Sequence, residues 1–369
     1  AYYRAGRGEY RLFQLTKRLT GGELPTVYTV DLRQELQEGN RSIFSRKLQE
    51  LMTDRLNKGQ QTILFLNRRG YAGFVSCRSC GEVMKCPHCD VSLSEHKGGR
   101  LICHYCGYTQ PMPKLCPKCG SKYILGFKAG TQQIEEKLKE LYPGVRTLRM
   151  DADTTRTKDS YEKILSAFSN GEADVLIGTQ MIVKGHDFPK VTLVGILAAD
   201  LSLNASDYRA GERTFQLLTQ AVGRAGRGVL PGEAVIQTYQ PDHYAITCAA
   251  AQDYKSFYEE EILYRELSGY PPAAHMLAVQ IYGKEEENVK QLARRLTDVV
   301  KSNMDFLQIL GPTPANISKI NDIYRYVFYA KHAEYDTLVA VKDCVEETLR
   351  QWQPRQLSIQ FDFDPVNVL

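Results

Sequence analysis

The sequence predicts an α/β protein with a parallel sheet, interrupted by a cysteine-rich insertion that holds two zinc ions and followed by a smaller α+β domain. Three observations predict this architecture. Short apolar strands alternate with amphipathic helices before residue 271, four Cys-x-x-Cys pairs crowd into residues 77–119, and residues 271–369 show two strand–helix–strand patterns. At 369 residues the chain is long enough for two or three domains, each with its own core.

The first part of the chain shows strand and helix periods in turn. After Ile43, for example, Leu48, Leu51 and Met52 fall on one helical stripe that Gly59 can end. Strands that alternate with helices in this way indicate a parallel sheet with crossover helices. The expected helices span residues 43–59, 131–141, 161–168 and 243–270, and the expected strands span residues 62–66, 145–150, 175–177 and 191–198.

The cysteine-rich insertion carries the strongest chemical signal. Each Cys-x-x-Cys turn can offer two thiolates to one tetrahedral ion, so four turns make two Cys₄ zinc sites. A disulfide framework is typical of small secreted proteins, and a redox pair would need one such turn, not four in series. The ligands we expect are Cys77, Cys80, Cys86, Cys89, Cys103, Cys106, Cys116 and Cys119.

The spacing of these pairs favours a nested arrangement. Five residues separate the first two pairs, which is too tight for a ribbon loop, whereas thirteen separate the second and third. Closing the inner pairs around one ion brings the outer pairs together around the other. We expect His88, His96 and His104 to lie at the surface or beside the ligands.

Two glycine-rich charged turns occur between Asp174 and Arg227. The first follows the apolar strand Val175–Ile177, and the second, Gly223-Arg224-Ala225-Gly226-Arg227, ends a helical segment. Such turns bind ligands at the carboxyl ends of strands in open α/β sheets. On a helix, Arg224 and Arg227 would share one face and suit a phosphoryl group. Alone, the second turn is equally typical of a basic surface loop.

Residues 271–369 read as β-α-β-β-α-β, the ferredoxin-like order. The expected strands are 276–282, 306–310, 324–330 and 357–363, the helices are 285–301 and 335–352, and a long Pro-containing loop follows residue 310. In the strand from Tyr324 to Lys331, aromatic and basic residues interleave. Such a strand can bind DNA through Arg325, Tyr326 and Lys331, or one face can lie in the core.

Composition bounds the function only loosely. The net charge of +4 permits a nucleic-acid partner without requiring one. No apolar run is long enough for a transmembrane helix, and the N-terminus has no signal peptide and no initiator Met, which suggests a piece of a longer protein. Cysteines used as metal ligands favour a reducing cytoplasm.

The charged turns resemble motifs V and VI of superfamily 2 helicases. The run Gly-Thr-Gln-Met-x-x-Lys-Gly-His-x-Phe-Pro from Gly178 is similar to the PriA family of primosomal replication-restart DNA helicases. The resemblance covers the whole chain. It implies that residues 1–75 and 121–270 form a second RecA-like helicase lobe, that residues 76–120 are the zinc-binding module, and that residues 271–369 bind DNA and partner proteins.

The resemblance also implies roles for single residues. Arg224 and Arg227 would reach the γ-phosphate of ATP, and Gln220 would lie beside the nucleotide. The residues expected to couple nucleotide to DNA are Gly178, Thr179, Gln180, Lys184, Gly185 and Asp187.

The implied full-length protein is an ATP- and Mg²⁺-dependent 3′→5′ helicase of the bacterial cytoplasm and nucleoid. It would recognise stalled or abandoned forks and direct primosome assembly for replication restart. The implied partners are forked and single-stranded DNA, primosome proteins and the single-stranded-DNA-binding protein. This sequence has no Gly-x-x-x-x-Gly-Lys-Ser/Thr loop, so we expect no ATP hydrolysis by the chain alone. The alternative is a zinc-ribbon adaptor with a vestigial motor lobe.

Overall fold

The computed structural model describes residues 1–15, 23–66, 75–88, 91–96, 99–125, 130–151, 153–155, 157–183, 187–205, 207–304, 307–353 and 356–366. The chain divides into two compact units. The first comprises residues 1–83, 113–205 and 209–257, and the second comprises residues 84–112, 206–208 and 258–369. Within the described residues, no helix combines the length and the apolar character needed to cross a membrane.

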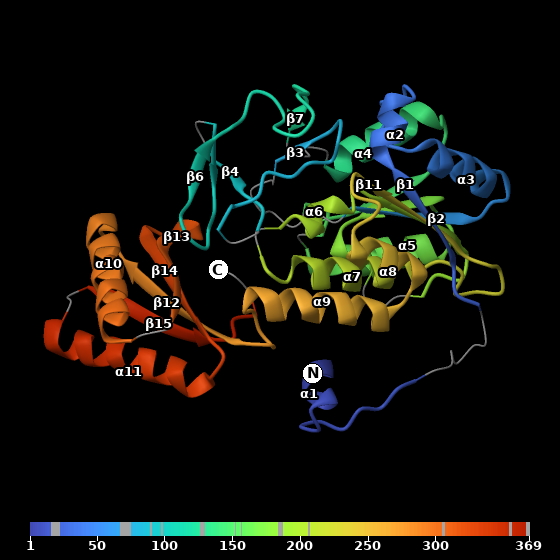
Figure 1. The fold of residues 1–369 in the computed structure, drawn as a ribbon. Coiled ribbons are helices and arrows are strands. Elements are labelled where there is room, and N and C mark those ends of the chain that lie inside the picture. The colour runs from blue at the N-terminus through green and yellow to red at the C-terminus, as the bar shows by residue number, and fades with distance from the viewer. Residues whose placement is uncertain are drawn as a thin grey trace. The chain divides into compact units, whose positions relative to one another are not determined.

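A six-stranded parallel sheet forms the centre of the first unit (Figure 1). Its middle strands are continuous apolar runs, as expected for strands buried on both faces. In spatial order the strands are β1 (Thr26–Asp31), β11 (Glu233–Thr238), β10 (Val191–Leu197), β2 (Gln61–Leu66), β9 (Val175–Gly178) and β8 (Thr147–Met150). The predicted parallel sheet is confirmed.

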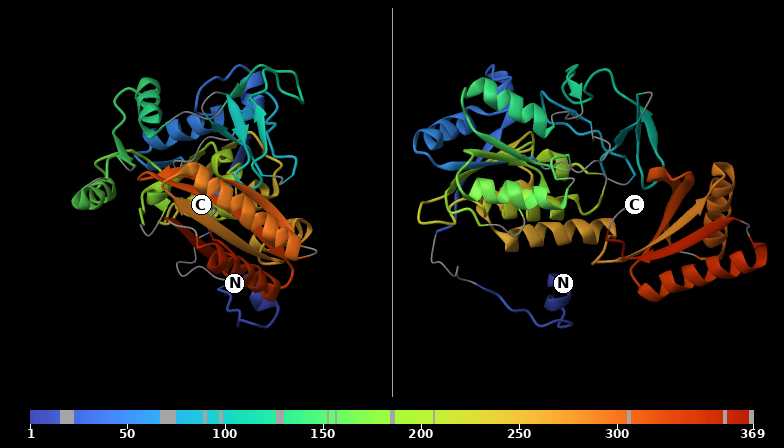
Figure 2. Two further views of the ribbon diagram at one scale, coloured as in Figure 1. Left: turned by 90° about the vertical axis from the view of Figure 1, so that its left-hand side faces the viewer. Right: turned by 180° about the vertical axis from the view of Figure 1, so that it is seen from behind.

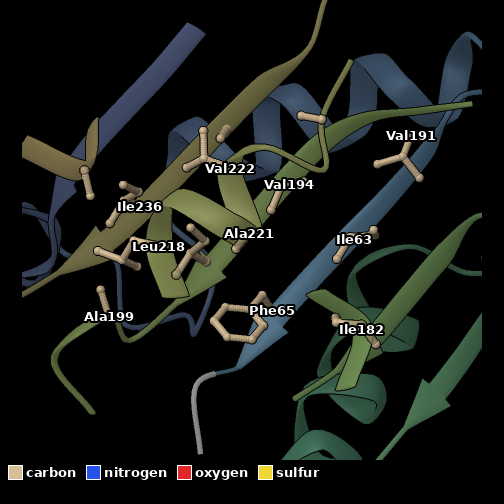
Figure 3. Packing of buried hydrophobic residues seen from close by; sticks show 14 of the residues in the cluster. Ile63, Phe65, Ile182, Val191, Val194, Ala199, Leu218, Ala221, Val222 and Ile236 are labelled. Atoms are coloured by element: carbon tan, nitrogen blue, oxygen red, sulfur yellow. The ribbon is translucent and has the colours of Figure 1, made fainter. Parts of the chain in front are cut away.

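Successive strand residues point to opposite faces of the sheet. Since both sets are apolar in the middle strands, helices cover both faces. Ile63 and Phe65 of β2 join a core with α5 (Lys158–Ser169), α7 (Ala210–Val222) and α8 (Tyr244–Ala251). Figure 3 shows these two side chains together with Leu218 and Ala221 of α7. Leu64 and Leu66 join a second core with α3 (Arg46–Asn57) and α4 (Thr131–Leu141). The shorter helices of the first unit are α1 (Tyr2–Gly6), α2 (Leu32–Gln37), η1 (Gln180–Val183) and α6 (Asp200–Leu203).

Strand β11 is absent from the sequence-based expectations, although it lies between β1 and β10. Its apolar part, Ala234–Ile236, is too short to show a period by itself. The helical expectation for residues 243–270 is confirmed as two helices, α8 and α9 (Tyr254–Ser268), with Gln252 between them in the left-handed region at φ +55°.

The second unit contains a four-stranded antiparallel sheet with helices α10 and α11 on one face (Figures 1 and 2). The strand order is β13-β14-β12-β15, and the predicted β-α-β-β-α-β order is confirmed. The elements are β12 (His275–Gly283), α10 (Glu286–Asn303), β13 (Gln308–Ile320), β14 (Ile323–His332), α11 (Tyr335–Trp352) and β15 (Leu357–Phe363).

The long Pro-containing loop expected after residue 310 is wrong. Strand β13 continues through it to Ile320, with register shifts between Leu310 and Thr313 and between Pro314 and Lys319. Because β13 is an edge strand, Pro312 and Pro314 can replace N–H donors that a central strand would need.

The cysteine-rich insertion contributes to both units. Its outer ends, β3 (Ser76–Cys77) and β7 (Ile124–Leu125), pair within the first unit. Its middle forms a small sheet in the second unit, made of β4 (Ser94–His96), β5 (Arg100–Ile102) and β6 (Thr109–Pro111).

Candidate functional site

Four cysteines meet in the first unit. The Sγ atoms of Cys77, Cys80, Cys116 and Cys119 all lie within 4.8 Å of one another. The Cys77–Cys119 and Cys80–Cys116 sulfur pairs are each 3.6 Å apart. A disulfide requires about 2.05 Å, whereas sulfurs about 2.3 Å from a tetrahedral zinc stand about 3.8 Å apart. These separations fit a shared metal ion.

A second cluster lies in the second unit. The Sγ atoms of Cys86, Cys103 and Cys106 lie within 4.8 Å of one another, and those of Cys86 and Cys106 are 3.5 Å apart. The fourth expected ligand, Cys89, lies outside the described residues. The outer pairs and the described cysteines of the inner pairs therefore gather separately, in the nested arrangement that the spacing favours.

All four Cys-x-x-Cys turns repeat one backbone pattern. The N–H of the first cysteine donates to the carbonyl five residues on, at 2.8 Å in every turn. In three turns a glycine follows the second cysteine with positive φ: Gly81 (+76°), Gly107 (+77°) and Gly120 (+70°). These glycines are a sequence signal for the turn, because other residues are strained in that region.

The ionisation of the crowded thiols also points to a cation. Burial opposes ionisation of Cys77, but backbone N–H groups and neighbouring thiols outweigh it and lower its pKa to about 7. Burial and the other cysteines raise the pKa of Cys80 to about 12, and burial and neighbouring thiols raise that of Cys86 to about 12. Ionisation of one thiol thus disfavours ionisation of the next. A divalent cation would supply the positive charge that lets all of them ionise.

The three histidines have different surroundings. His88 is exposed, with its ring edge-on to Tyr108. His104 is buried next to Cys103, and its Nε2 lies 3.0 Å from that of the half-buried His96. Burial first, and then His96, lower the pKa of His104 to about 4, so this ring is neutral at physiological pH.

Strand β9 delivers the first charged turn to the carboxyl edge of the sheet. A Cβ on its last residue, Gly178, would lie 2.6 Å from Met150 O and 2.7 Å from Ile182 Cγ2. Thr179 and Gln180 follow, both half-buried, and Ile182 of η1 packs into the same core as Leu218 of α7 (Figure 3). Lys184 and Gly185 lie outside the described residues.

The second charged turn, residues 223–228, is called the arginine turn below. Helix α7 ends at Val222, so the two arginines follow the helix and do not share one of its faces. Arg224 is buried, whereas Arg227 is exposed. Arg227 Nε donates to Gly223 O at 2.8 Å, and its Nη1 pairs with the carboxylate of Asp187.

Close backbone contacts fix the arginine turn. The Gly226 N–H donates to Val191 O at 3.0 Å. A Cβ on Gly226 would lie 2.4 Å from Gly232 N, and one on Gly228 would lie 2.4 Å from Pro189 O. No side chain fits at either glycine without a backbone shift, so both are required by packing, and Gly226 is required also by its positive φ of +67°.

The two charged turns lie at opposite edges of the sheet, which corrects the expectation that both lie at carboxyl ends. Gly178 aligns with Phe65 at the carboxyl end of β2, but Val191, which holds the arginine turn, aligns with Gln61 at its amino end. Asp187, Arg224 and Arg227 therefore gather at the amino edge. Gln220, also expected near the nucleotide, is exposed on α7 one turn before Arg224.

Sequence reasoning missed a buried carboxylate at the carboxyl edge. Asp200 accepts hydrogen bonds from Tyr239 N and Thr238 Oγ1, both at 2.9 Å, and burial raises its pKa. Tyr239 also contacts the first cysteine turn, because the guanidinium of Arg78 in that turn lies 4.9 Å from the centroid of the Tyr239 ring. The sequence signal that could have identified Asp200 is its position three residues after the buried strand β10.

The three expected DNA-binding residues of β14 have unequal exposure. Tyr326 packs into the core beneath the helices. Lys331 is buried, donates to Ser268 O at 2.6 Å and lies 3.9 Å from the Tyr270 ring centroid. Arg325 remains half exposed, so of these three it is the one placed to meet a ligand.

Three family models match the chain. The helicase conserved C-terminal domain matches residues 115–229, the PriA DNA helicase Cys-rich region matches 86–111, and the primosomal protein N C-terminal domain matches 266–366. The arginine turn and Gly178 fall within the first match, and the second cysteine cluster falls within the second.

Curated relatives extend these matches over nearly the whole chain. Replication restart protein PriA of Bacillus subtilis is 45% identical over 99% of this chain and 46% of its own length. The proteins of that name from Synechocystis and Haemophilus influenzae are 42% and 36% identical, over 96% and 95% of this chain and 43% and 47% of theirs. The chain thus spans about half the length of these relatives.

Proposed function

Because the chain belongs to the PriA family of replication restart proteins, we propose that it supplies the second motor lobe, the cysteine-rich region and the C-terminal domain of an ATP-driven 3′→5′ DNA helicase that acts at abandoned replication forks. The observation that carries this proposal is the arginine turn. It holds two guanidinium groups in one backbone-locked loop beside Asp187.

The electrostatics of the turn suit an incoming phosphate. Burial first, and then the neighbouring charge of Arg227, lower the pKa of Arg224, and Asp187 offsets only part of this effect. A γ-phosphate would relieve the repulsion between the two arginines and could take Arg227 from its ion pair with Asp187. Stabilising charge on a transferring phosphoryl group is the work of an arginine finger.

The arginine turn would supply one half of an ATP site, and this sequence has no Gly-x-x-x-x-Gly-Lys-Ser/Thr loop to supply the half that binds the phosphates. Phosphate-binding loops and Mg²⁺-binding carboxylates act from the facing motor lobe in such enzymes. We therefore expect the isolated chain to hydrolyse no ATP and the full-length protein to hydrolyse it in response to DNA. Thr179 and the turn around Lys184 would relay the state of the nucleotide to the DNA backbone.

The two cysteine clusters would each hold one structural Zn²⁺, the first on Cys77, Cys80, Cys116 and Cys119 and the second on Cys86, Cys103 and Cys106 with Cys89. The clusters and the C-terminal domain would bind forked and single-stranded DNA, primosome proteins and the single-stranded-DNA-binding protein. The relatives' name, replication restart protein, supports a role in DNA replication, and the proposed place of action is the bacterial cytoplasm.

The test is Arg227→Ala in the full-length protein. An arginine finger contributes about 10³–10⁵-fold in turnover, so DNA-stimulated ATP hydrolysis should fall by that order while DNA affinity changes little. Arg146→Ala is the matched control, since Arg146 is an exposed arginine of the same unit, ion-paired to Asp174 at 2.5 Å. Its turnover should stay near that of the parent protein.

Two outcomes would count against the proposal. Near-parental turnover in Arg227→Ala would reduce the turn to a structural role. A full-length protein that binds DNA and partners without any ATP hydrolysis would favour the zinc-ribbon adaptor with a vestigial lobe.

A further inference from the structure

Helices α10 and α11 pack on one face of the C-terminal sheet and leave its other face to different neighbours. On β12, Leu277, Val279 and Ile281 enter the core beneath α10 and α11. Strand alternation turns Met276, Ala278, Gln280 and Tyr282 to the other side. The register places Lys331, Tyr329, Val327 and Arg325 of β14 opposite those four residues, on the same outer face.

One half of this outer face is already covered within the second unit. Tyr105, which stands between two cysteines of the second cluster, packs against Tyr329 with ring centroids 5.2 Å apart. A Cβ on Gly107 would lie 3.4 Å from Thr313 Oγ1, and Lys331 is held by Ser268 and Tyr270 as described above. At this end of the sheet the outer face is therefore buried against other residues of the second unit.

The other half carries a row of accessible polar and aromatic groups. Tyr282 lies opposite Arg325 on β14 and opposite Ser358 on β15. Tyr282 and Arg325 are half-buried, and Ser358 and Gln360 are exposed. In the next row Gln280, which is buried, lies opposite Gln360.

These groups are organised around the tyrosine ring. Tyr282 Oη donates to Gln360 Oε1 at 3.2 Å and also contacts Gln280 Oε1. The Arg325 guanidinium lies 5.7 Å from the ring centroid. One side of the group therefore offers a cation over an aromatic ring, and its tip offers the exposed amide of Gln360.

We propose that this row, Tyr282 with Arg325 and Gln360, binds a nucleotide of single-stranded DNA. An unstacked base would lie on the Tyr282 ring, Arg325 would neutralise a neighbouring phosphate, and the Gln360 amide would hydrogen-bond the edge of the base. Aromatic side chains on an open four-stranded sheet bind bases in this way. The inference deepens the proposed function, since it rests on DNA binding by this chain.

The chemistry favours a single strand over a duplex or a protein. A base in a duplex has both faces stacked and cannot reach a ring that lies on a sheet, whereas a single strand can turn a base out. The row contains one cation and no acidic side chain. A protein-docking face would instead need a larger apolar centre.

Fluorescence anisotropy of the whole chain on oligothymidylate and on a blunt duplex tests this. Stacking is worth about 1–3 kcal/mol per base, so Tyr282→Ala should weaken single-strand binding about 5- to 150-fold, while Tyr282→Phe should retain most of it. Arg325→Ala should lower the salt slope by about 0.7 for one lost phosphate contact. Duplex affinity should be unchanged in all three variants.

The control is Tyr335→Ala, which removes a tyrosine of the same unit that is 44% exposed but belongs to the helical layer. Photo-crosslinking of the unmutated chain to 5-iodouracil DNA gives a second measurement that does not depend on the variants' folding, and the crosslink should map to β12. Parental affinity in Tyr282→Ala, equal losses on single strand and duplex, or a crosslink outside β12, β14 and β15 would each overturn the proposal. Since none of these measurements involves ATP, they are independent of the Arg227 test.

Discussion

Gly226→Ala is the sharpest single change to the arginine turn. Gly226 has φ +67°, and an added Cβ would lie 2.4 Å from Gly232 N and 2.7 Å from Gly232 Cα. The left-handed conformation costs an alanine about 1–2 kcal/mol, and forcing packed backbone apart costs about 1–3 kcal/mol more. We expect the variant to lose about 2–5 kcal/mol of stability in the first unit.

Gly144→Ala separates the two contributions. Gly144 also has positive φ, +88°, and lies in the same unit, but nothing stands within 4 Å of an added Cβ. It should lose only the conformational part, about 1–2 kcal/mol. The difference between the two variants therefore measures how tightly the arginine turn is locked against the segment around Gly232.

Hydrogen exchange of peptides from β10 and β11 in increasing urea reports on the first unit. The sequence has one tryptophan, Trp352, which lies in the second unit. Its fluorescence is therefore an internal control, and its urea-dependent change should be the same in the variants as in the parent protein. Equal losses in Gly226→Ala and Gly144→Ala would refute the close contact. In full-length protein, a displaced turn should also lower ATP turnover for Gly226→Ala but not for Gly144→Ala.

Two further predictions concern metal and pH. Metal analysis should give two zinc ions per chain, and one zinc or none would contradict the prediction. Structural zinc contributes on the order of 10–16 kcal/mol of apparent binding energy. Chelation should therefore expose the amides of residues 77–119 to hydrogen exchange while those of the parallel sheet stay protected. Burial opposes ionisation of Asp174, but hydrogen bonds from Arg146 outweigh it and lower its pKa. Its stabilising effect is then present above the unfolded pKa of about 3.9 and lost as pH falls through the lower folded value. Asp174→Asn should flatten the acid limb of stability against pH, and an unchanged limb would exclude this role.

Local patterns predicted most of the elements and the cysteine clusters. Helices such as α4 and α11 show their period within one segment, and a Cys-x-x-Cys turn brings its own two ligands together. The nested pairing followed from loop lengths alone. These features share a physical basis, since each depends on contacts between residues close in sequence or on a spacing that few geometries satisfy.

What the sequence did not predict depends on long-range pairing. The prolines of β13 are acceptable only because that strand is at an edge, and edge position is a property of the sheet. In the same way, the arginine turn lies at the amino edge because α7 carries the chain back across the sheet before β11 begins. Motif spacing pointed to Arg224 and Arg227 as candidate site residues, but it predicted neither the edge on which they lie nor their unequal burial.

The nested order of the cysteine pairs has a structural reason, because the two clusters hold different parts of the chain. The outer pairs stay with the first unit, where a Cβ on Gly81 would lie only 2.5 Å from Tyr239 O at the end of β11. The inner pairs belong to the second unit, where Tyr105 is buried against Tyr329. Pairing the first turn with the second would have tied cysteines of one unit to those of the other. Nesting lets one insertion leave the first unit, contribute its middle part to the second unit, and return while the described cysteines of each cluster stay inside a single unit.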